Sequence, residues 1–157
     1  MNVLPKHAEK DPVAQKILFA VGCLAACHPD NNARLLRLQV IETIDSIFTK
    51  HIEGEAISQG SYRAIAGLAS NNPAIQNKFS EQAPLLKTVV RSLYHEVESD
   101  ICSRWGCVAI TALARKHSGN QSKLGYAVGR LLLFTVVKDE AFDLLEYNSL
   151  VRFNVVG

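Results

Sequence analysis

The chain has 157 residues, of which 48% are hydrophobic and 20% are charged, and this composition excludes intrinsic disorder and suits one folded domain. Lysine and arginine exceed aspartate and glutamate by 17 − 15 = 2, so the charge gives no indication of a nucleic-acid partner. The first residues contain no apolar signal core, and the longest apolar run, Leu131 to Val137, is too short for a membrane span. We therefore expect neither secretion nor insertion into a bilayer.

Helical patterns follow one another along the chain with few breaks. Asp11-Pro12 is suited to cap a first helix, and a second helix ends near Asn71 before another begins after Asn72-Pro73. Longer apolar helices are expected over residues 39–50, 83–97 and 127–138, each after a short polar helix. Hairpin dipeptides and long period-two alternation are missing, so the sequence predicts an all-α fold.

Three segments of the chain repeat one pattern without a gap: residues 16–35, 60–79 and 105–124. Each contains a Leu-Ala dipeptide, at Leu24, Leu68 and Leu113, so the period is 44 and then 45 residues. Alanine stands four residues before each leucine, and a turn with Pro, Asn-Pro or Ser-Gly follows. The pattern predicts three equivalent long helices, each burying its leucine in an apolar stripe.

Four cysteines lie among apolar helical neighbours: Cys23, Cys27, Cys102 and Cys107. Free cysteine behaves as a small hydrophobic residue, so we expect all four to be reduced and near the core of a cytoplasmic or nuclear protein. Cys23, Cys27 and His28 could share a helix face and bind a metal. Zinc sites usually have two tight ligand pairs and no second pair is present, so we expect no metal site.

The phrase AIAGLASNNPAIQNKF, from Ala64 to Phe79, resembles the signature of the armadillo repeat family. In that family a long third helix ends in Leu-Ala, and an Asn/Pro turn leads to a short helix with an amide and a basic residue. The resemblance covers residues 12–138 and implies a single domain, residues 1–157. That domain would be a right-handed α-solenoid of about three three-helix repeats, with an incomplete N-terminal unit and a closing helix over residues 139–153. HEAT repeats, which have two helices and a similar length, are the alternative.

The resemblance implies that the third helices line a concave face, which is the usual binding surface of a solenoid. The residues at the matching positions are Lys16, Phe19, Arg63, Asn71, Trp105 and Lys116. Importin-alpha-like members carry a tryptophan and an asparagine on each of these helices. Here the tryptophan position is taken by Phe19, Arg63 or Val108, and the asparagine position by Cys23, Gly67 or Ala112. We therefore do not expect this chain to bind a nuclear-localisation peptide. The basic residues favour an acidic partner held by aromatic anchors. Alternatively, the two lysines are only solvated and Trp105 seals the core.

No nucleophile elbow, P-loop, dinucleotide fingerprint or His-Glu-x-x-His motif is present, so we expect neither an enzyme nor a cofactor. The five histidines mostly fall at predicted helix ends, where a cation favours the helix dipole. The resemblance favours a non-enzymatic scaffold or adaptor that binds a protein or peptide. The alternative is a structural subunit whose open ends stack into a homo-oligomer or a larger assembly.

Overall fold

The computed structural model describes residues 11–26, 28–51 and 54–138. Within these ranges every regular element is a helix, which confirms the predicted all-α fold. The helices are α2 (Asp11–Ala25), α3 (Pro29–Arg37), α4 (Val40–Lys50), α5 (Glu55–Ala69), α6 (Pro73–Glu81), α7 (Ala83–His95), α8 (Asp100–Ala114) and α9 (Ser118–Lys138). The closing helix predicted over residues 139–153 lies outside the described residues.

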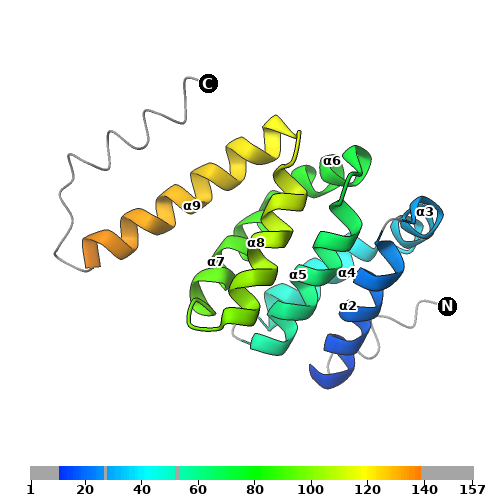
Figure 1. The fold of residues 1–157 in the computed structure, drawn as a ribbon, viewed down its shortest axis with the longest axis horizontal. Coiled ribbons are helices and arrows are strands. Elements are labelled where there is room, and N and C mark those ends of the chain that lie inside the picture. Colours follow the sequence, from blue (N-terminus) through cyan, green and yellow to red (C-terminus); the bar gives the residue numbers. More distant parts are fainter. Residues whose placement is uncertain (1–10, 27, 52–53, 139–157) are drawn as a thin grey trace.

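The long helices α2, α5 and α8 lie side by side in one layer, with α5 in the middle (Figure 1). α2 and α5 run parallel: Gly60 of α5 packs on Leu18 of α2, and further toward both C-termini Gly67 of α5 packs on Gly22 of α2. α8 packs on α5 in the same direction. The three helices that end on the repeated Leu-Ala phrase are therefore neighbours in space and point the same way.

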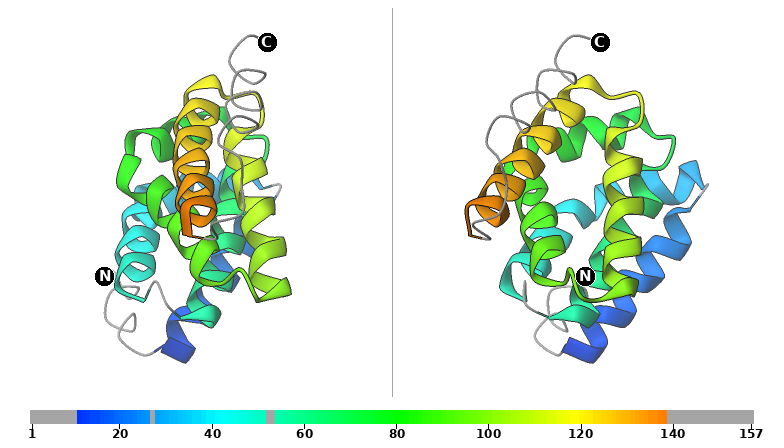
Figure 2. Two further views of the ribbon diagram at one scale, coloured as in Figure 1. Left: turned by 90° about the vertical axis from the view of Figure 1, so that its left-hand side faces the viewer. Right: turned by 60° about the vertical axis from the view of Figure 1, so that its left-hand side comes forward.

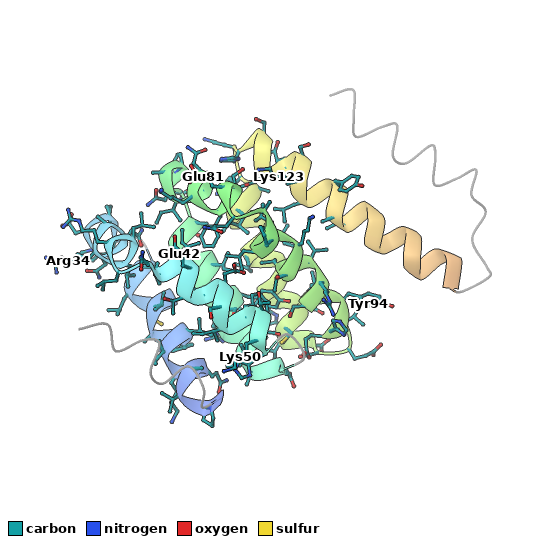
Figure 3. The ribbon with its side chains drawn as sticks, turned by 180° about the vertical axis from the view of Figure 1, so that it is seen from behind. Arg34, Glu42, Lys50, Glu81, Tyr94 and Lys123 are labelled. Carbon is teal, nitrogen blue, oxygen red and sulfur yellow. The ribbon has the colours of Figure 1, made fainter. Side chains whose placement is uncertain are left out.

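A second layer covers one side of these three helices. It contains α4 and α7, which are seen from behind in Figure 3, where Glu42 and Lys50 mark α4 and Tyr94 marks α7. The short helices α3 and α6 lie at one end of the layers, and α9 packs along α7 and against α8 (Figure 2). The core between the layers includes the fully buried rings of Phe48 and Tyr62, which meet edge to face with centroids 5.5 Å apart.

The turns after α2, α5 and α8 are built alike. His28 Nδ1 accepts a hydrogen bond from the Asn31 N–H at 3.3 Å, Asn72 Oδ1 accepts one from the backbone at 3.2 Å, and His117 Nδ1 accepts one at 3.0 Å from the Asn120 N–H. Each acceptor lies four residues after the repeated leucine and caps the following helix at its N-terminus. His28 and His117 therefore lie at helix ends, as predicted, where the ring of each caps the helix that follows.

The backbones of α2 and α5 approach each other closely at two glycines. A Cβ atom added at Gly22 would lie 2.7 Å from the carbonyl oxygen of Arg63, and one added at Gly67 would overlap the carbonyl oxygen of Gly22. Only glycine lacks a side chain that would prevent this contact. The glycines that weaken each helix in isolation thus allow the two helices to pack with their backbones in contact.

The three repeated leucines are not equally buried. Leu68 and Leu113 have no exposed surface, but Leu24 is 55% exposed, so its predicted burial is wrong. α2 packs beside α5, and α5 packs beside α8, so each of these two later helices is covered by the one before it. α2 comes first and has no such neighbour among the described residues. Ala20, four residues before Leu24, is exposed for the same reason.

Two further expectations are corrected. The short and long helices predicted separately in the third unit form one helix, α9. Neither a proline, such as Pro84 near the start of α7, nor a positive φ, such as that of Gln39 before α4, interrupts the stretch. Cys23 and Cys107 are exposed rather than buried, and only Cys102 is a core residue among the three described cysteines. Both exposed thiols lie on sides of α2 and α8 that no described helix covers, whereas Cys27 lies outside the described residues.

Candidate functional site

A stacked arginine joins the three parallel helices on the side opposite α4 and α7. The guanidinium carbon of Arg63, on α5, lies 4.8 Å from the ring centroid of Phe19, on α2, and 4.2 Å from the ring centroid of Trp105, on α8. Both distances are within the range of a cation–π interaction. The structure therefore brings together three of the six residues implicated by the sequence, one from each repeated helix.

Helical spacing explains why Arg63 faces outward. The inward side of α5 carries Ile65 and Leu68, which are fully buried, while Arg63 shares its side with the partly exposed Gly67 and the exposed Ser70. Arg63 itself is partly buried, because the two rings cover the guanidinium. Phe19 remains 45% exposed, so the stack formed by Phe19, Arg63 and Trp105 is open toward solvent on the α2 side.

Within the described part of the chain, Arg63 makes no ion pair and no hydrogen bond through its side chain. Its Nε atom is buried without a partner. Guanidinium groups that only stabilise a fold usually pair with a carboxylate or a carbonyl group. The two terminal nitrogens of Arg63 are not among the buried unpaired atoms, and neither has a hydrogen-bond partner among the described residues.

The stack answers both alternatives raised for these aromatic and basic side chains. Trp105 is partly buried and packs against the core, as expected if it seals the core, but Arg63 also stacks on its ring. Lys16 and Lys116 are exposed, and neither joins the stack. Lys116 and Asn71 both have positive φ, 56° and 53°, at the turns after α8 and α5.

A pocket lies beside the stack, between the C-terminal halves of α5 and α8. Its volume is about 310 Å³, and its lining residues are Ser70, Asn71, Cys107, Val108, Thr111, Ala112 and Arg115. Asn71 was among the residues implicated by the sequence, whereas Cys107, Thr111 and Arg115 were not predicted. These three recur every four residues along α8, so a helical projection would have placed them on one stripe.

The lining of the pocket decides what it can hold. Its walls carry short apolar groups, two hydroxyl groups and one guanidinium group, that of Arg115, which is exposed. No carboxylate lines it. Pockets of this size sit at the lower end of those that bind small molecules, and this one suits a single side chain.

Two glycines of α5, on the side that the resemblance assigned to the concave face, have a structural role. Gly60 is buried against Leu18, and Gly67 packs on the backbone of Gly22, so neither lines an open groove. The stacking of Arg63 across both helices depends on this packing, because it sets the distance between α2 and α5.

The opposite ends of these helices carry an acidic cluster. Ser99 Oγ donates to the carboxylate of Glu55 at 2.6 Å, and the thiol of Cys102 donates to the backbone oxygen of Glu55. Burial, and then the charge of Glu55, raise the pKa of the Glu96 carboxyl above its usual value. Burial also raises the pKa of the Cys102 thiol, so this cysteine is poorly suited to act as a nucleophile.

Among the described residues, no three His, Cys, Asp or Glu side chains are grouped so that they could hold a metal ion. No helix in the described part of the chain is both long enough and apolar enough to cross a membrane. The chain matches no family of known proteins, and neither a curated protein nor a solved structure matches it.

Proposed function

We propose that this protein is a non-enzymatic scaffold that binds a protein or peptide partner on the outer side of α2, α5 and α8. The observation that carries the proposal is Arg63, a cation stacked against two aromatic rings with no anion partner among the described residues. An arginine ordered in this way is suited to a carboxylate, because its fork of N–H donors matches two oxygens and little further entropy is lost on binding.

The proposal includes an armadillo-like solenoid as the architecture. It is supported by the parallel order of α2, α5 and α8 and by the equivalent caps at His28, Asn72 and His117. A further support is that Asn31 donates to the carbonyl of Leu24 as Asn120 donates to that of Leu113, at 2.9 and 3.0 Å. The continuous helix α9 departs from a three-helix unit.

The experiment is affinity capture from the source cells with three baits: the wild type, Arg63→Gln and Arg91→Gln. Arg91 is an exposed arginine on α7, in the other layer, and serves as the matched control. The proposal expects a partner that the wild type and Arg91→Gln retain equally and that Arg63→Gln retains at least tenfold less. Equal retention by all three baits would remove the proposal's basis.

A second candidate function rests on a different observation, the exposed flank of α2. Leu24 is 55% exposed where the equivalent leucines of α5 and α8 are covered by a neighbouring helix, so another helix could pack there. This favours a subunit that stacks through its open end. Sedimentation velocity of the wild type and of Leu24→Glu tests it: assembly that Leu24→Glu abolishes supports stacking, and a wild type that stays monomeric at high concentration opposes it.

A further inference from the structure

We infer that the stack and the neighbouring pocket form two parts of one site, which takes an extended acidic peptide: a carboxylate at Arg63 and, about three residues away, an aliphatic side chain in the pocket. This inference rests on the proposed function and specifies the partner's chemistry.

The stack fixes the direction from which a ligand reaches Arg63. The guanidinium carbon lies over the rings of both Phe19 and Trp105, and Nε is buried. Only the edge with the two terminal nitrogens remains available. A planar group with two acceptor oxygens, approaching in the plane of the guanidinium, makes two parallel hydrogen bonds there.

The charge favours a carboxylate over a phosphate. Arg63 is one cation, and the aromatic faces around it supply no second donor for a dianion. A single stacked guanidinium balances the single charge of an aspartate or glutamate side chain. Glutamate, with its longer side chain, reaches the edge while its backbone stays above the helices.

The pocket supplies the second contact. Val108 and Ala112 form apolar walls, and the hydroxyl groups of Ser70 and Thr111 lie beside them. Its volume of about 310 Å³ accommodates one aliphatic side chain of a peptide. Arg115 at the same pocket is a second exposed cation, which favours a peptide with net negative charge.

The distance between the two contacts sets the spacing in the peptide. Arg63 precedes Ser70 by seven residues on the α5 side of the site, which corresponds to about 10 Å along a helix axis. In a polyproline-II conformation, residues three apart lie on the same side and about 9 Å from each other. The site therefore fits an acidic residue and an aliphatic residue separated by two others.

The test uses the full-length ¹⁵N-labelled protein and defined peptides. The first peptide is acetyl-Gly-Glu-Gly-Gly-Val-Gly-amide; the others replace its glutamate by glutamine, its glutamate by phosphoserine, or its valine by glycine. NMR titration gives the affinity and the residues that respond. We expect the largest shifts in α5 and α8. We also expect a loss of affinity of about tenfold on replacing glutamate by glutamine, as is typical of a charge-assisted pair, and of roughly threefold or more on replacing valine by glycine.

Two protein variants separate the two contacts. In Arg63→Gln, the preference for glutamate over glutamine should disappear while the preference for valine remains. In Thr111→Trp, which fills the pocket from an exposed position, the preference for valine should disappear while that for glutamate remains. Lys87→Gln, at an exposed position on α7, is the control and should change neither preference.

Several results would overturn the two-part site. They are an absence of binding by the first peptide at millimolar concentration, a glutamate preference that survives Arg63→Gln, and binding of the phosphoserine peptide more than tenfold tighter than that of the glutamate peptide. None of them alters the capture experiment with Arg63→Gln, which tests the proposed function separately. A partner lost by Arg63→Gln together with unbound peptides would keep the scaffold and discard this peptide chemistry.

Discussion

The same substitution at two equivalent places should have very different costs. Leu68→Ala removes a side chain with no exposed surface from the middle of the layered core, so it should destabilise the protein by roughly 2–5 kcal/mol. Leu24→Ala changes the same residue type at the same repeat position, but this side chain is 55% exposed. It loses at most about half of the burial, and alanine is the better helix former, so the expected cost is below about 1 kcal/mol.

Urea unfolding followed by circular dichroism measures both costs, with the slope of the transition checked to be unchanged. In a thermal scan, a chain of this length should lose roughly 2–4 °C per kcal/mol, so the midpoint of Leu68→Ala should fall by the order of 10 °C. Leu24→Ala should stay within a few degrees of the wild type. Equal losses in the two variants would show that Leu24 is covered in solution or that the two positions are not equivalent.

Three further predictions concern packing, capping and pH. Gly67→Ala should destabilise the protein by more than about 2 kcal/mol in urea unfolding, because the added Cβ would overlap a backbone oxygen of α2. The control, Gly125→Ala, has nothing within 4 Å of the added Cβ and should stabilise the protein by up to about 1 kcal/mol. A Gly67→Ala variant as stable as the wild type would contradict the close packing. Asn72→Ala should cost about 1 kcal/mol through the lost cap of α6, and Asn72→Asp should restore it. Burial and the charge of Glu55 raise the folded-state pKa of Glu96, so its carboxyl stabilises the fold at low pH and this contribution is lost as the pH rises through that pKa. Glu96→Gln should therefore be more stable than the wild type at neutral pH and lose this advantage on acidification; an advantage independent of pH would refute the assignment.

The layer of parallel helices could be predicted because the sequence repeats its own packing. Leu-Ala recurs at Leu24, Leu68 and Leu113 in helices that the structure places next to one another. The burial of each leucine could not be predicted from that repeat. A repeat specifies how a residue faces its neighbour, whereas only the order of units along the chain determines whether a neighbour is present.

The single helix α9 shows a second limit. In the first two units the break comes from particular local geometry: Gln39 has a φ of 55°, and Gln82 leads into Pro84. The third unit has the same apolar spacing and no such residue, so the helix continues. A pattern aligned by its hydrophobic residues misses breaks that depend on a single backbone conformation.

The candidate site was predicted as a set of positions but not as an arrangement. Spacing placed Phe19, Arg63 and Trp105 on one side of their helices, and the structure then showed the guanidinium between the two rings. Trp105 stands one turn before the position matching Phe19, and no rule of spacing pairs it with Arg63. That contact depends on how far α8 is shifted along α5, which only the packing of whole helices determines.

The most direct measurement of the central claim is the Nε–Hε resonance of Arg63 in a ¹⁵N correlation spectrum, assigned by its loss in Arg63→Lys. Two flanking rings should shift this proton upfield, and Trp105→Leu should return it toward the position of a free arginine. Because the guanidinium has no anion of its own among the described residues, adding the captured partner or the glutamate peptide should then move the resonance. A resonance at the free-arginine position, or one that does not respond to a saturating partner, would contradict the claim that Arg63 is a stacked and available anchor.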